Sequence, residues 1–210
     1  MKLIAPCTLL TLAVAATCLR AEDEGRWMVK ARGTSSQVSN GSEGINALYI
    51  TSNSFQVNNK ASFELDLDFY LSKNLSLELG AGPAVSHTLQ FNSVNLDTSL
   101  GTFKESTSFL TLRYHFLPDE MVDPYFGLGM NKTTFGSAQI SYSGSALTLG
   151  SHDLGVAMQL GLDVKFASHW YANVDIKYFQ SKTDLNTQGA LLTTLSLNPM
   201  AYSVGIGYRF

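Results

Sequence analysis

Apolar and polar residues alternate strictly at the carboxyl end of the chain. From Met200 to Phe210, apolar or aromatic residues occupy every second position, and the positions between them are small or polar, as at Ser203 and Arg209. A strand of this kind has one face suited to lipid and one suited to a lumen, which is typical of outer-membrane barrels. Because the pattern runs through to an aromatic final residue, it favours a closed membrane sheet.

The same alternation recurs along the chain. It predicts eight strands, over residues 26–38, 61–71, 75–90, 106–117, 124–135, 153–166, 170–180 and 199–210. The connections alternate between tight segments (72–74, 117–123, 167–169) and long ones rich in Ser, Thr, Asn and Gly (39–60, 92–105, 136–152, 181–198). Short periplasmic turns, long outer loops and an even strand number define transmembrane barrels. We therefore expect an all-β fold: an eight-stranded antiparallel transmembrane up-and-down β-barrel.

The amino-terminal segment has the features of a secretory signal. Lys2 precedes an apolar run, and Ala21 is followed by acidic residues, which predicts removal of residues 1–21 and a single barrel domain over 22–210. Cys7 and Cys18, the two cysteines, both lie in the removed part. The mature chain is thus expected to have no disulfide, no thiolate metal site and no cofactor.

Composition narrows the function classes. The formal charge is -3 with few charged residues, so nothing indicates a nucleic-acid partner. Mean hydropathy is near neutral, as expected when the membrane pattern is spread over alternating strands. Catalysis is not expected, because none of His87, His115, His152 and His169 has a Ser and an acid at a motif spacing.

Aromatic residues cluster at the ends of the strands nearest the tight turns, as an interfacial girdle would. The girdle is expected to contain Trp27, Phe69, Tyr70, Tyr114, Phe116, Tyr125, Phe126, Phe166, Trp170, Tyr171, Tyr208 and Phe210. The alternative is a secreted lipocalin-like binder, which would bury the apolar face instead. The shared level of the aromatics and the glycines on the polar face favour the membrane barrel.

The polar face carries complementary charges on neighbouring strands. Charges in a narrow lumen must be paired or hydrated, so we expect one network, with structural filling favoured over a transport or catalytic role. Its expected members are Lys30, Arg32, Glu64, Asp66, Asp68, Glu78, Arg113, His115, Asp163, Lys165, Asp175, Lys177 and Arg209.

Toward the outer half, the same face becomes smaller and less polar. This change predicts a partly hydrophobic cavity above a charged plug, because an eight-stranded barrel is barely wider than its own side chains. The expected lining residues are Ala84, Phe109, Gly129, Ala157, Ala201, Ser203, Phe135 and Phe179.

Several stretches form a specific series through their order and spacing: residues 67–71 (LDFYL), 74–79 (NLSLEL), 110–116 (LTLRYHF), 123–131 (DPYFGLGMN), 133–135 (TTF), 161–163 (GLD), 198–199 (NP) and 205–210 (GIGYRF). Through these stretches, the sequence resembles the OmpW family of bacterial outer-membrane proteins over essentially the whole mature chain. The chain departs from the family pattern at Thr107 and Ser108, at residues 152–155, and in the spacing of Pro83 and His87.

The resemblance implies a barrel in the bacterial outer membrane whose cavity helps small hydrophobic molecules cross, with lateral exit into the bilayer. Pro83 lacks an N–H for the strand ladder and is a candidate for the lateral gap, a simple bulge being the alternative. The expected partners are membrane lipid and lipopolysaccharide, small hydrophobic solutes, the barrel-assembly machinery through Phe210, and a bacteriocin at the outer loops. A structural or adhesive barrel without transport is the other function class left open.

Overall fold

The computed structural model describes residues 25–43, 52–93, 96–142 and 144–210, so the expected signal segment lies outside the described residues. All regular elements in these ranges are strands. They are β1 (Trp27–Gln37), β2 (Gly41–Ser42), β3 (Phe55–Val57), β4 (Lys60–Ser72), β5 (Leu75–Ala81), β6 (Val85–Ser93), β7 (Leu96–His115), β8 (Val122–Tyr142), β9 (Ser145–Leu149), β10 (His152–Lys165), β11 (Trp170–Phe179), β12 (Lys182–Thr187), β13 (Ala190–Ser196) and β14 (Met200–Arg209). None of these residues forms a helix long and apolar enough to cross a membrane.

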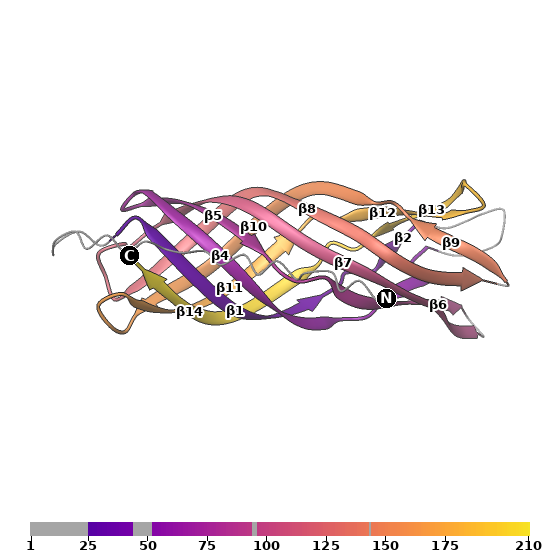
Figure 1. Ribbon diagram of the computed structural model, residues 1–210, viewed down its shortest axis with the longest axis horizontal. Coiled ribbons are helices and arrows are strands. Elements are labelled where there is room, and N and C mark those ends of the chain that lie inside the picture. Colours follow the sequence, from indigo (N-terminus) through magenta and orange to yellow (C-terminus); the bar gives the residue numbers. More distant parts are fainter. Residues whose placement is uncertain (1–24, 44–51, 94–95, 143) are drawn as a thin grey trace, which may run out of the picture.

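The strands close into an eight-stranded antiparallel barrel, as the alternation predicts. The wall runs β1, β4, β5 with β6, β7, β8, β10, β11 and β14, and β14 pairs with β1 from Arg209 opposite Met28 to Met200 opposite Gln37. The first and last barrel strands therefore begin and end together at the end with the tight turns (Figure 1). We call this the periplasmic end and the opposite one the outer end.

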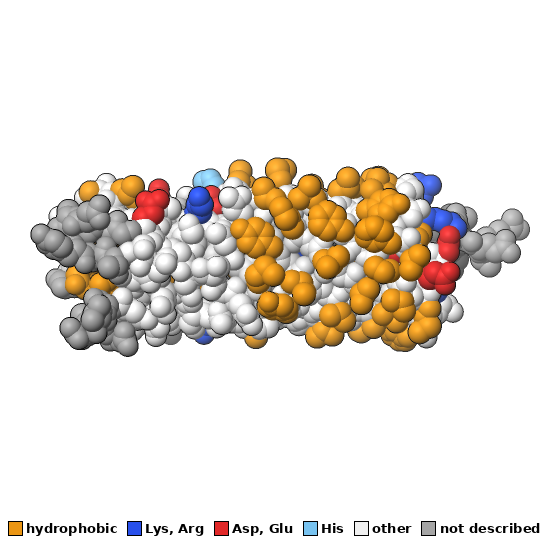
Figure 2. Space-filling model, turned by 180° about the vertical axis from the view of Figure 1, so that it is seen from behind, with side chains coloured by type: hydrophobic (Ala, Val, Ile, Leu, Met, Phe, Trp, Pro, Cys, Tyr) orange, Lys and Arg blue, Asp and Glu red, His pale blue; other side chains and the backbone are white. Residues whose placement is uncertain are grey.

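The apolar face of the wall points outward. Leu160 is 59% exposed and Val204 is 64% exposed, while Lys30 and Arg113 are completely buried inside. Figure 2 shows the apolar side chains as a band across the visible face of the barrel, in the part nearer the periplasmic end. This distribution fits a wall surrounded by lipid and rules out the lipocalin alternative, which requires the opposite arrangement.

Three aromatic residues assigned to the girdle lie elsewhere. Tyr70, Tyr125 and Tyr171 are buried in the lumen, whereas Trp27, Trp170 and Tyr208 lie on the exposed surface. The prediction was wrong for these three tyrosines because side chains alternate strictly along a strand, and their parity matches that of the charged face. Their hydroxyl groups can thus reach polar partners that lipid would not supply.

The outer half of the barrel is longer than predicted. The segments expected as loops contain the outer part of β7 and β8 and the additional strands β9, β12 and β13. These segments are rich in Ser and Thr, which obscures the alternation in the sequence. Their inward-facing residues contribute to an apolar core above the membrane band. This outer core contains Phe55, Val57, Leu89, Phe91, Leu100, Phe103, Phe135, Ile140, Leu147, Leu185, Leu195 and Leu197.

The wall is interrupted beside β4. Strand β5 pairs with β4 up to Ala81 opposite Leu65, and the next segment, β6, pairs instead with β3 from Val57 opposite Leu89. Residues 82–84 between β5 and β6 belong to no strand, and they contain Pro83, which cannot donate to a ladder. Along the described part of this seam, the ladder is therefore broken at the outer edge of the apolar band.

We predict that Leu160→Arg destabilises the barrel, because a charge on the lipid face costs roughly 2–4 kcal/mol near the bilayer midplane. Denaturant unfolding of the protein in lipid vesicles measures the loss. Ser141→Arg, an exposed position in the outer extension of β8, is the matched control and should leave stability unchanged. Equal losses for the two variants would contradict the assignment of the lipid face.

Candidate functional site: a plugged lumen below a small outer cavity

Arg32 on β1 lies at the centre of the lumen, where it contacts carboxylates from three other strands. Its guanidinium Nη1 is 2.7 Å from Asp175 Oδ2, and Nη2 is 2.9 Å from Glu78 Oε2. Longer contacts of 3.3 Å join it to Glu64 and Asp66. A planar guanidinium with several fixed donors suits such a site, because it can bind several carboxylates at once.

A second group of ion pairs lies toward the periplasmic end. Arg113 contacts Asp68 at 2.6 Å and Glu78 at 2.8 Å, and Lys30 contacts Asp68 at 2.9 Å and Asp163 at 3.3 Å. Glu78 is thus shared by Arg32 and Arg113, which joins the two groups into one network. All of these side chains are almost completely buried, so the pairing offsets a large desolvation cost.

Lys177 completes the network on the outer side. Its ammonium group lies 2.7 Å from Glu64 and 2.9 Å from Asp175. Tyr125 also donates its hydroxyl hydrogen to Asp175 at 3.2 Å, and Asn173 donates to Asp163 at 2.7 Å. Ion pairs therefore span the lumen from wall to wall and leave it blocked at this level.

Two residues expected in the network lie toward its periplasmic rim. Lys165 and Arg209 line a polar cavity of about 250 Å³ that opens between the tight turns. Arg209 stacks on the ring of Tyr70, with 3.8 Å between the guanidinium carbon and the ring centroid, and donates to the carbonyl oxygen of Gly25 at 2.7 Å. Both residues frame the entrance to the plug.

His115 links Ser76 and Asp123 in a chain of hydrogen bonds. Its Nδ1 lies 2.6 Å from Asp123 Oδ2, and its Nε2 lies 2.9 Å from Ser76 Oγ, an arrangement that superficially resembles a hydrolytic triad. Ser76 also accepts a hydrogen bond from Arg113 Nε at 3.2 Å, and both Ser76 and His115 are completely buried. Through Ser76, this chain of hydrogen bonds is connected to Arg113 and so to the ionic plug.

An apolar layer covers the plug on its outer side. Phe109, Ala157, Phe179 and Ala201 form one buried cluster, with the two phenylalanine ring centroids 5.3 Å apart. Ser203 lies beside it and shares a 3.0 Å hydrogen bond with Thr34. Four residues of the expected cavity lining thus pack against one another as a floor, and two of them, Phe179 and Ala201, also line the cavity above it.

The remaining expected lining residues lie elsewhere. Phe135 belongs to the outer core, and Ala84 is exposed in the interruption between β5 and β6, where the chain leaves the strand and its alternation ends. A Cβ at Gly129 would clash with the carbonyl oxygen of Leu110, so this glycine permits close packing of the wall. Ala84 was predicted as a lumen residue, and this prediction was wrong because the chain leaves the strand there.

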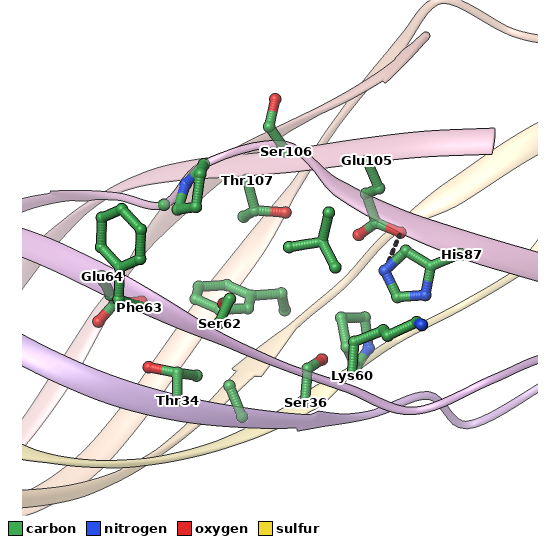
Figure 3. Close-up of a pocket in the computed structure, with 16 residues that line it drawn as sticks. Thr34, Ser36, Lys60, Ser62, Phe63, Glu64, His87, Glu105, Ser106 and Thr107 are labelled. Atoms are coloured by element: carbon green, nitrogen blue, oxygen red, sulfur yellow. Dashed lines mark ion pairs between the residues drawn. The ribbon is translucent and has the colours of Figure 1, made fainter. Parts of the chain in front are cut away.

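A cavity of about 80 Å³ lies directly above the floor (Figure 3). Phe179 and Ala201 close it below, and Phe63, Gly82 and Pro83 border it at the break in the wall. The remaining lining is Thr34, Ser36, Lys60, Ser62, Glu64, Val85, His87, Glu105, Ser106, Thr107 and Pro199. Phe63 is also exposed on the lipid side, so the cavity reaches the outer edge of the apolar band.

Several residues of the site were absent from the sequence prediction. Tyr125, Asn173 and Asp123 join the ionic plug, and His87 and Glu105 line the outer cavity. The parity of Tyr125 along β8 would have placed it inside the barrel. Placing His87 beside Glu105 would have required the pairing register of β6 against β7, in which Val85 lies opposite Glu105. Within the described residues, no group of three or more His, Cys, Asp or Glu could hold a metal ion.

A closed antiparallel barrel with an apolar outer band and a charged lumen defines an outer-membrane β-barrel protein. The chain belongs to the OmpW family, whose sequence profile matches residues 23–210. It is located in the outer membrane, as are the proteins that it resembles.

Individual relatives agree with this assignment. Outer membrane protein W of Vibrio cholerae is 28% identical over 90% of this chain and 91% of its own length. Outer membrane protein AlkL of Ectopseudomonas oleovorans is 26% identical over 73% of this chain and 68% of its own. Among solved structures, OprG from Pseudomonas aeruginosa shares the fold with a TM-score of 0.77 at 22% identity, covering 89% of this chain and 96% of OprG.

We predict that Arg113→Met destabilises the barrel by about 3–5 kcal/mol, because Asp68 and Glu78 each lose one partner charge while they stay buried. Denaturant unfolding in lipid vesicles measures this loss. Lys73→Met is the control, since the Lys73–Asp119 pair is exposed and such pairs contribute little. A loss no larger than that of the control would show that the plug is not stabilised by these pairs.

Glu105 makes stability depend on pH. It lies beyond the apolar band, which on β7 begins only at Leu110, and its burial raises its pKa from 4.5 to about 7. The folded state therefore holds this proton more tightly than the unfolded state, so a contribution present below pH 4.5 is lost as the pH rises through about 7. We expect Glu105→Gln to gain stability relative to the native protein between pH 5 and pH 8, measured as the temperature at which the compact electrophoretic form disappears. A constant difference over this range would contradict burial of an ionisable carboxyl.

Proposed function

We propose that this barrel provides a path for small hydrophobic molecules through the outer membrane, entering from outside and leaving sideways into the bilayer. The observation that carries the proposal is the position of the outer cavity. It lies between an apolar floor that seals the lumen and a break in the wall at Pro83. A solute that reaches this cavity has no straight route downward, but it has an opening toward lipid.

Three features support this path. The outer core supplies an apolar interior above the membrane band, where a hydrophobic solute is more stable than in water. The ionic plug excludes such a solute, because entering it would separate buried charges. Phe63 borders both the cavity and the outer surface, so an apolar contact continues through the break.

The relatives agree with a barrel in the outer membrane. AlkL and OprG are outer-membrane barrels of the same type, and the chain shares its family with outer membrane protein W. The outer core is packed with side chains, so passage requires them to move apart. A barrel that only binds partners at its outer hairpins would need neither the cavity nor the break, which makes it the weaker reading.

We predict that closing the break stops uptake. Phe63→Cys and Ala84→Cys place two exposed thiols on either side of it, and no other cysteine remains if residues 1–21 are removed. A short cleavable linker between them should reduce uptake of a radiolabelled alkane by whole cells to the level of cells lacking the protein. Cleavage of the linker should restore uptake.

The matched control is a linker across an intact seam. Ser35→Cys and Tyr202→Cys lie opposite each other on β1 and β14, where the ladder is continuous. Linking them should leave uptake unchanged. Continued uptake with the linker across the break would overturn the lateral route, and equal uptake with and without the protein would overturn the proposed function itself.

A further inference from the structure

The outer cavity contains a pair of buried hydrogen-bond acceptors that the path for hydrophobic solutes does not need. Glu105 on β7 and His87 on β6 lie beside each other on one side of the cavity, with Glu105 Oε2 3.9 Å from His87 Nε2 (Figure 3). Both residues are less than a tenth exposed. Their separation is too long for a hydrogen bond between them.

The hydrogen bonding of His87 fixes which of its nitrogens faces Glu105 as an acceptor. Nδ1 lies 3.0 Å from the backbone carbonyl oxygen of Asn58, and because a carbonyl oxygen only accepts, Nδ1 carries the hydrogen. Burial lowers the pKa of His87 below its usual value, and the charge of Lys60 acts in the same direction. The neutral ring then presents the lone pair of Nε2 to the cavity.

Glu105 lacks a hydrogen-bond partner at the same place. Its Oε2 is buried and has no hydrogen-bond partner among the described residues. A buried acceptor without a partner is costly, and two acceptors that face each other repel unless a donor lies between them. The cavity is thus complementary to a group that donates a hydrogen bond, placed next to the apolar surface of Phe179 and Ala201.

We infer that the outer cavity binds the hydroxyl head of an apolar alcohol, which donates to Glu105 and packs its chain against the apolar floor or through the break at Pro83. The cavity of about 80 Å³ suits a small head group and not a whole drug-sized ligand. Lys60 disfavours an ammonium head and Glu105 disfavours a carboxylate, so a neutral donor fits best. This inference rests on the proposed function and adds a selectivity to it.

The test is a binding titration of the full mature barrel in lipid nanodiscs at pH 8, where Glu105 is ionised, with amide resonances of Val85 and Ser106 as the readout. We expect 1-decanol to reach half-saturation at a concentration about tenfold lower than decane, the effect of one hydrogen bond to a charged group. Glu105→Leu should remove this preference, so that decanol and decane reach half-saturation at equal concentrations. Glu105→Gln, which keeps an acceptor of nearly the same shape, should retain part of it and serves if the leucine variant does not fold.

Glu120→Leu, the same change on an exposed periplasmic turn, is the control and should retain the native preference. Equal binding of decanol and decane to the native barrel, or a preference that survives Glu105→Leu, would overturn the inference. Alkane uptake by cells, measured with the same variants, reports the proposed function separately. Unchanged alkane uptake together with no preference for decanol would leave the path intact and remove only the selectivity.

Discussion

The rest of the structure depends on the buried ion pairs in the lumen. An eight-stranded barrel in lipid must place polar side chains inside, and its interior is too narrow for bulk water to hydrate them. Arg32 and Arg113 pair with carboxylates from several strands, and they share Glu78, so the buried charges stabilise one another. Because the pairs join strands that are distant along the chain, they fix the barrel from inside and also close it to straight passage.

The break in the wall matters because the plug closes the lumen. In a barrel with an open lumen, the interruption at Pro83 would be a local irregularity without consequence for transport. Here it lies at the level where the lumen is sealed, between an apolar floor and an apolar outer core. The fold therefore blocks straight passage along the lumen and leaves the wall interrupted beside the seal.

The sequence predicts the architecture well because membrane strands are constrained twice. Lipid requires an apolar residue at every second position, and the ladder requires closure, so period-two alternation identifies the eight barrel strands. Above the membrane only the inward positions are constrained. Ser and Thr can then occupy the outer face, which explains why the outer parts of β7 and β8 were expected to be loops.

The site could be predicted less completely, for two physical reasons. Alternation along a strand shows which residues point inward, and it correctly places Arg32, Glu78 and Arg113 inside the barrel. It does not show how closely the inward side chains pack against one another. Phe109 and Ala157 are therefore packed inside the floor, whereas Ala201 lines the cavity as predicted. The second reason is register: His87 and Glu105 meet only because β6 pairs with β7 beyond the break, and no local pattern reveals that pairing.

The placement of those two residues links selectivity to the route. In the ionic plug each cation contacts at least two carboxylates, so every buried charge there lies next to an opposite charge. Glu105 and His87 are buried to a similar degree, yet they face each other across 3.9 Å as two acceptors. Burial without mutual satisfaction raises the free energy of the empty cavity, and a donor from outside the protein lowers it. The cavity beside the break thus combines an apolar surface, an interruption of the wall and a buried acceptor without a hydrogen-bond partner.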